Sequence, residues 1–84
     1  MSETGTIVKN VVEYIVSEIV EDKKSVKVDI GSSTEDSVQI EVRTSPGDMG
    51  RVIGKRGRVA RAIRTVAQAA AEEEGINSSV EFID

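Results

Sequence analysis

The first quarter of the chain carries a four-residue repeat of apolar pairs. Valine and isoleucine occupy adjacent positions at 7/8, 11/12, 15/16 and 19/20, and the residues between these pairs are mostly polar. Positions four apart lie on the same face of an α-helix, so this spacing predicts an amphipathic helix over residues 6–22, even though valine and isoleucine favour strands. The apolar stripe of this helix is expected to lie in the core.

Two later segments alternate between apolar and polar residues. Residues 26–30 and 38–42 place valine or isoleucine at every second position, which predicts two half-buried strands. Residues 31–37 between them have the composition of a turn, so the two strands are expected to form a hairpin. Val80 and Phe82 alternate with polar neighbours and predict a third strand over residues 77–83.

The segment between the hairpin and the third strand predicts two helices. Ser45 and Pro46 fit the start of a short helix, with Ser45 as its cap, that ends near Ile53. A second helix is expected from about residue 58 to residue 74. We therefore predict an α+β fold with the order helix, strand, strand, helix, helix, strand. Three helices would cover one face of a three-stranded sheet. The single domain would span residues 5–84, after a flexible segment over residues 1–4.

The charged residues are unevenly distributed. The net charge is −4, yet residues 49–71 carry six basic residues and no acidic ones, which leaves −10 for the rest of the chain. This distribution predicts one anion-attracting face on a body that otherwise repels anions. Such a protein would orient a nucleic acid rather than be coated by it.

The centre of the basic region reads Gly-Lys-Arg-Gly at residues 54–57. Glycine allows close approach of the backbone to a partner and dihedral angles that other residues avoid. The helix that follows presents N–H groups and the positive end of its dipole. Together with two side-chain cations, these features indicate a place where a phosphate group is held.

Catalysis is not indicated by the composition. Histidine and cysteine are both absent, which removes the commonest general base, the thiol nucleophile and the soft metal ligands. The acidic runs at 35–36 and 72–74 are typical of solvated charge rather than of a paired-carboxylate site. A nucleotide-binding P-loop is disfavoured because the spacing from Gly50 to Gly54 is one residue short, and Arg56 occupies the position that needs serine or threonine. We expect a protein that is not an enzyme and has no cofactor or metal.

The residues around this centre resemble a known RNA-binding family. The run from Val52 to Gly57, with Ile63 six residues on, resembles the core of the KH domain. The predicted element order resembles the type II form of that fold. From about Gly5 to the end, the chain resembles the bacterial KhpA family of small stand-alone KH proteins. One departure is Ala60, where many KH domains carry a large aliphatic residue.

This resemblance implies a role for each residue near the loop. In KH domains a GxxG loop grips a short single strand by its backbone. By resemblance, Gly54 and Gly57 shape the loop and the cations face sugar and phosphate, while neighbouring apolar residues form a floor under about four bases. Arg61 recedes from the loop by one turn, and Arg64, two turns away, is left out of the set. The candidate RNA-binding residues are Arg51, Val52, Ile53, Gly54, Lys55, Arg56, Gly57, Arg58, Val59 and Arg61.

Two hypotheses follow for the function. The first is a non-catalytic protein that grips short single-stranded RNA and acts as a post-transcriptional regulator or RNA chaperone. The residues themselves do not distinguish RNA from single-stranded DNA. The second is a protein-interaction or dimerisation module, because the resemblance implies pairing with itself or with a larger KH protein of the KhpB or Jag type. No apolar run is long enough for a membrane span and no signal peptide is indicated, so we expect a cytoplasmic protein without a membrane partner.

Overall fold

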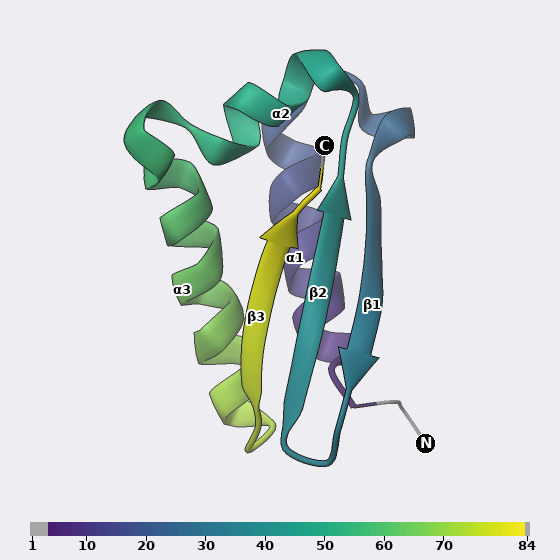
Figure 1. Ribbon diagram of the computed structural model, residues 1–84, viewed down its shortest axis with the longest axis vertical. Coiled ribbons are helices and arrows are strands. Elements are labelled where there is room, and N and C mark those ends of the chain that lie inside the picture. Colours follow the sequence, from purple (N-terminus) through teal and green to yellow (C-terminus); the bar gives the residue numbers. More distant parts are fainter. Residues whose placement is uncertain (1–3, 84) are drawn as a thin grey trace.

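The computed structural model describes residues 4–83, and its elements follow the predicted order (Figure 1). In chain order they are α1 (Thr6–Ile19), η1 (Lys23–Ser25), β1 (Lys27–Ser33), β2 (Ser37–Arg43), α2 (Pro46–Ile53), η2 (Lys55–Gly57), α3 (Arg58–Glu73) and β3 (Asn77–Phe82). The short elements η1 and η2 are 3-10 turns. The three predicted helices and three predicted strands are all confirmed.

The three strands form one mixed sheet in the order β1-β2-β3. The predicted hairpin is confirmed: β1 runs antiparallel to β2, and the N–H of Thr34 donates to the carbonyl of Ser37 at 2.8 Å. β3 runs parallel to β2. Parallel neighbours need a long crossover connection, and α2, η2 and α3 provide it. The segment with the candidate loop is therefore the crossover itself.

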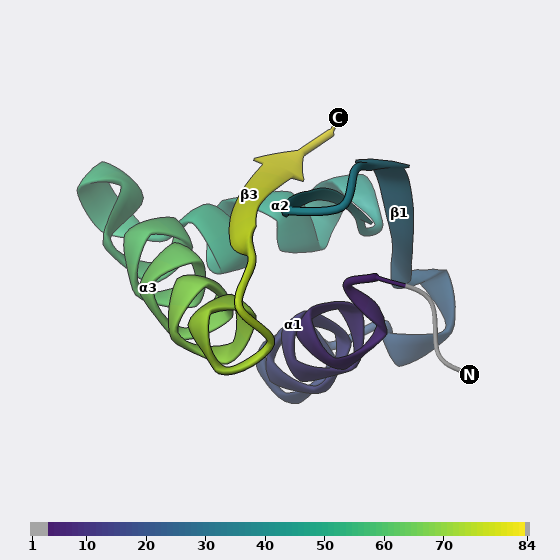
Figure 2. The same cartoon turned by 90° about the horizontal axis from the view of Figure 1, so that it is seen from below.

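The helices cover one face of this sheet. Figure 2 shows α1 and α3 side by side on that face, while α2 crosses one end of the molecule. Each helix and strand contributes apolar side chains to one continuous core. The repeat in α1 is confirmed, because Val8, Val12 and Val16 have no exposed surface. Burial of this apolar stripe, rather than helix propensity, stabilises a helix so rich in β-branched residues.

The opposite face of the sheet is polar. The cross-strand register places Asp29 opposite Glu41, and Glu41 opposite Glu81, so three carboxylates lie in a row across the strands. Lys27 lies opposite Arg43 at the end of the same face. The alternation predicted for the strands thus gives one apolar and one charged surface.

Two predicted boundaries differ from the structure by three residues. α1 ends at Ile19 rather than near residue 22, because Val20 is extended and the N–H groups of Glu21 and Asp22 donate to a side chain elsewhere in the fold. The turn of the hairpin is shorter than predicted, since pairing continues to Ser33 and resumes at Ser37. Polar side chains do not prevent pairing where they point to the solvated face of a sheet.

Some expectations concern the ends of the chain. The flexible segment over residues 1–4 falls, except for Thr4, outside the described residues, and so does Asp84 at the end of the predicted domain. Within residues 4–83, no helix is both long and apolar enough to cross a membrane.

Candidate nucleic-acid interface

A sharp backbone corner joins α2 to α3. Gly54 ends α2 with φ 76° and ψ 172°, and its N–H donates to the carbonyl of Gly50 at 2.8 Å. The N–H of Gly57 then donates to the carbonyl of Gly54 at 3.1 Å, and α3 begins at Arg58. Residues 54–57 are therefore a tight, hydrogen-bonded turn rather than an open loop.

The two glycines of the corner serve different purposes. A Cβ at Gly54 would overlap the side chain of Val59 and lie 2.9 Å from its backbone nitrogen, so residue 54 must lack a side chain for the corner to close. Gly57 faces open space, and only its φ of 72° favours glycine. Arg56, at φ 57°, is the only non-glycine residue between 4 and 83 with a positive φ. That conformation costs roughly 1–2 kcal/mol for an L-residue, and such strained positions cluster at functional sites.

Three cations project from this corner. Lys55, Arg56 and Arg58 are exposed, and among the described residues their side chains make no hydrogen bond or ion pair. They stand at the start of the 16-residue helix α3, where the positive end of the dipole adds to their charge. The structure thus brings together the three cations that the sequence predicted to contact sugar and phosphate.

Arg61 supports the corner from the first turn of α3. Its Nη2 donates to the carbonyl of Arg56 at 3.2 Å, which helps to hold the residue with positive φ in place. Arg61 is otherwise exposed. Its predicted RNA contact stays a prediction, and the structure adds a bracing contact with the loop backbone.

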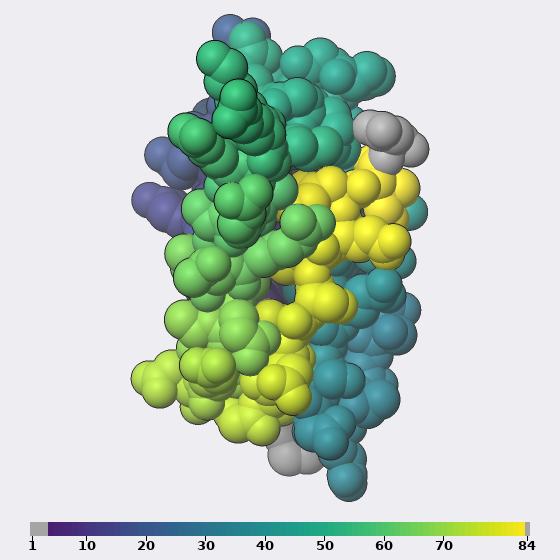
Figure 3. Space-filling model, turned by 60° about the vertical axis from the view of Figure 1, so that its left-hand side comes forward, coloured from purple at the N-terminus to yellow at the C-terminus, as the bar shows by residue number. Residues whose placement is uncertain are grey.

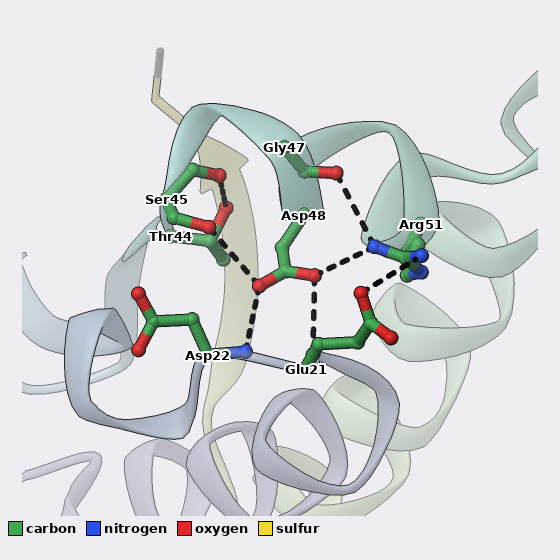
Figure 4. Close-up of polar contacts among 7 residues, drawn as sticks. All are labelled: Glu21, Asp22, Thr44, Ser45, Gly47, Asp48 and Arg51. Atoms are coloured by element: carbon green, nitrogen blue, oxygen red, sulfur yellow. Dashed lines mark hydrogen bonds and ion pairs between the residues drawn. The ribbon is translucent and has the colours of Figure 1, made fainter.

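Arg51, in the last turn of α2, forms ion pairs with two acidic residues. Its Nη1 lies 3.0 Å from Oδ1 of Asp48, and its Nη2 lies 3.1 Å from Oε1 of Glu21. Arg51 therefore links α2 to the end of α1 (Figure 4). The sequence grouped it with the loop cations, but the structure separates it from Lys55, Arg56 and Arg58 by its ion pairs.

Asp48 is the centre of that contact. Its carboxylate accepts hydrogen bonds from the N–H groups of Glu21 at 3.1 Å and Asp22 at 3.0 Å, although the residue has only 2% of its surface exposed. The Ser45 hydroxyl donates to the same carboxylate at 3.0 Å, so Ser45 occupies the cap position without its side chain capping the backbone. The backbone hydrogen bonds from Asp22 and Glu21, followed by those from Ser45 and Arg51, lower the pKa of Asp48 to about 2.

The apolar residues beside the loop divide into two groups. Val52 has no exposed surface and packs in the core beneath the corner, whereas Ile53 is 36% exposed and Val59 is half-buried. Ala60, the departure from the KH pattern, is also buried. Of the three residues predicted to form an apolar floor, only Ile53 and Val59 present surface to a ligand, and Val52 supports them from below.

A surface hollow lies between α3 and β3, and Arg61 in the first turn of α3 lines its end nearest the corner. Figure 3 shows this side of the molecule, with α3 and β3 next to each other. The hollow is lined by Arg61, Arg64, Thr65, Gln68, Ala69, Glu72 and Ser78. Oε1 of Gln68 accepts a hydrogen bond from the N–H of Ser78 at 2.9 Å and so ties the two elements together. Sequence reasoning missed this hollow because nothing local shows that β3 packs beside α3.

Comparison with known proteins identifies the family. The family described as "KhpA/KhpB, KH domain" matches residues 9–82. The chain belongs to this family. The resemblance noted in the sequence and the predicted α+β KH fold are thereby confirmed.

Several curated relatives match most of the chain. It is 46% identical over 77 residues to the RNA-binding protein KhpA of Clostridium perfringens, across 89% of this chain and 99% of the relative. It is 37% identical over 84 residues to the RNA-binding protein KhpA of Borreliella burgdorferi, across 100% of both chains. For the RNA-binding protein KhpA of Aquifex aeolicus the identity is 38% over 76 residues, across 90% and 95% of the two chains. No solved structure matches the chain significantly.

The contact around Asp48 predicts a specific acid dependence of stability. The folded-state pKa of about 2 lies below the ordinary value, so the stabilisation is fully present above about pH 4 and is lost as the pH falls toward 2. The variant Asp48→Asn cannot accept all four hydrogen bonds and should unfold at lower urea concentration than wild type at pH 7. The gap between the two urea midpoints should shrink between pH 4 and pH 2.

The matched control is Asp29→Asn on the exposed sheet face, which should not lower the midpoint. Equal midpoints for wild type and Asp48→Asn at pH 7 would show that the buried carboxylate does not stabilise the fold.

Proposed function

We propose that this chain is a non-enzymatic RNA-binding protein that holds short single-stranded RNA at the corner formed by residues 54–57. The observation that carries the proposal is a group of exposed cations at the start of α3 that, within residues 4–83, make no hydrogen bond or ion pair: Lys55, Arg56 and Arg58. Membership of a KH family and relatives that carry the name RNA-binding protein support RNA as the ligand. We infer a cytoplasmic role as a post-transcriptional regulator or RNA chaperone.

The geometry supports different contact surfaces for the RNA backbone and for its bases. The strand's phosphates would lie against the corner beside Gly57, where a Cβ would face open space and none is present to hold the strand away. The bases would turn toward Ile53 and Val59 and into the hollow between α3 and β3. A footprint of about four nucleotides is the reach of such a loop.

The affinity of a single domain should be modest and salt-dependent. Three cations at the corner would neutralise about three phosphates. For single strands this gives a slope of about −2 in a plot of log affinity against log salt concentration. We infer that base contacts supply specificity and the corner supplies most of the electrostatic attraction.

A second KH chain is the further partner that we propose. The matching family includes the KH domains of both KhpA and KhpB proteins, which supports pairing with a copy of itself or with a KhpB-type protein. Ile7 and Tyr14 are 54% and 69% exposed, and their spacing of seven residues places them on the same outer face of α1. The outer face of α1 is on a different element from the RNA corner, so pairing and RNA binding would be compatible. Linking two weak sites would raise the avidity for RNA.

The first test replaces the two cations inside the corner. Lys55→Asp combined with Arg56→Asp should weaken binding of a short single-stranded RNA more than about tenfold, or about 1.4 kcal/mol, because attraction to phosphate becomes repulsion. The fold should survive, since both side chains are exposed and, within residues 4–83, neither makes a hydrogen bond or ion pair. Fluorescence anisotropy with a labelled oligonucleotide measures the affinity and its dependence on salt.

The matched control is Lys24→Asp combined with Lys27→Asp, which makes the same charge change on η1 and β1, on the opposite side of the molecule from the corner (Figure 1). This control should lose much less affinity and keep the salt slope near −2. Equal losses in the two double variants, or a slope near zero in wild type, would contradict gripping of phosphate at the corner.

The pairing proposal is tested by sedimentation at micromolar concentration with and without RNA. Wild type should sediment as a dimer, and Tyr14→Lys as a monomer that still binds RNA, because a charge is placed in an apolar interface. A dimer that does not bind any RNA would instead make protein interaction the main function of the chain. If wild type sediments as a monomer by itself and forms no complex with a KhpB-type protein, pairing is contradicted.

A further inference from the structure

The end of β3 carries an aromatic ring that is covered by a cation. The guanidinium carbon of Arg64, on α3, lies over the ring of Phe82 at 5.2 Å from its centroid. This distance is within the range of a cation–π contact. Phe82 is itself half-buried and packed against the core, so the ring is a fixed support rather than a mobile side chain.

A second contact fixes the orientation of the same guanidinium. Nε of Arg64 donates to the carbonyl of Val80 at 3.2 Å. Val80 lies on β3, two residues before Phe82. A planar group that is held at one edge and supported on one face has already lost most of its rotational freedom. Binding to its remaining face therefore costs little additional side-chain entropy.

The remaining surface of Arg64 faces the proposed RNA path. Arg64 is exposed and lines the hollow between α3 and β3. Within residues 4–83, neither of its Nη atoms has a hydrogen-bond or ion-pair partner. These atoms can donate to the oxygen and nitrogen acceptors on the edge of a base.

Other stacking surfaces in the chain are poorly placed for RNA. Its two aromatic residues are Tyr14 and Phe82. Tyr14 lies on α1, which does not line the hollow, and Arg64 covers the ring of Phe82. The exposed guanidinium groups beside the hollow are those of Arg61, which donates to the carbonyl of Arg56, and Arg64, which is supported by an aromatic ring. Single-stranded RNA bases stack on arginine planes as well as on aromatic rings.

We propose that Arg64, supported by Phe82, is a stacking platform for one nucleobase of the bound strand. The proposal rests on the proposed function, because it assigns a base contact to RNA that is held at the corner. It differs from a phosphate contact, which would need only the charge of Arg64. It also differs from a purely structural brace between α3 and β3, which would not affect the bases.

The test uses short single-stranded oligonucleotides with one 2-aminopurine at successive positions, because stacking quenches the fluorescence of this adenine analogue. With wild type we expect quenching on binding at one position that Arg64→Lys abolishes, since lysine keeps the charge but has no plane. The salt slope should stay the same in this variant. Arg58→Lys makes the same change at the exposed start of α3 and should leave the quenching intact.

A second measurement changes the RNA instead of the protein. An abasic nucleotide at the quenched position should weaken binding to wild type by about tenfold, the scale of one stacked base. The same change should have little effect on binding to Arg64→Lys. Circular dichroism melting of each variant confirms that it is folded.

The outcomes separate the platform from the site as a whole. RNA binding without quenching at any position, or equal quenching with Arg64→Lys, would overturn the platform and leave the corner proposal standing. Arg64→Gln removes the charge, and a salt slope that is reduced in this variant would identify Arg64 as a phosphate contact and also overturn the platform. Absence of RNA binding by wild type would overturn both proposals.

Discussion

The corner between α2 and α3 depends on the absence of a side chain at residue 54. Gly54 lies so close to the backbone and side chain of Val59 that a Cβ would overlap them, and its φ of 76° is a value that L-residues rarely adopt. Closing the chain this tightly turns α3 away from α2 within three residues and leaves Lys55, Arg56 and Arg58 on the outside of the turn. The local backbone therefore determines where the positive charge is concentrated on the surface.

The rest of the fold reinforces this arrangement through charge. The chain as a whole is acidic, and the open face of the sheet carries Asp29, Glu41 and Glu81 in one row. Like charges directly opposite one another on a sheet are unfavourable. Here Arg43 pairs with Glu41 at 3.5 Å, and Gln39 donates to Glu81 at 3.0 Å, which offsets part of that cost. Because this face repels phosphate, a strand attracted to the protein is directed toward the α3 side, where the basic residues gather.

Local patterns predicted most of the fold, and contacts between distant segments account for what they missed. The four-residue repeat of α1 and the alternation in β1 and β2 report burial within a single element, so element types followed directly. The end of α1 cannot be predicted in this way, because the N–H groups of Glu21 and Asp22 donate to Asp48, which is 27 and 26 residues away along the chain. For the same reason Arg51 was grouped with the loop cations. An apolar residue beside a loop looks the same in sequence whether it lines the core or a ligand site, so the sequence places Val52 in the apolar floor although it is buried. The sequence leaves Arg64 out of the site because it lies two turns from the loop, and nothing local shows that its partner Phe82 lies beside it.

The central claim is that the positively charged corner is where the strand docks. Nuclear magnetic resonance mapping of the backbone amides tests it most directly, with isotope-labelled wild-type protein titrated with a short single-stranded RNA. Our account predicts that the largest amide shift changes fall within residues 51–61 and saturate together. If those amides stay unmoved while another surface, such as the outer face of α1 or the open face of the sheet, responds to the RNA, the account is contradicted.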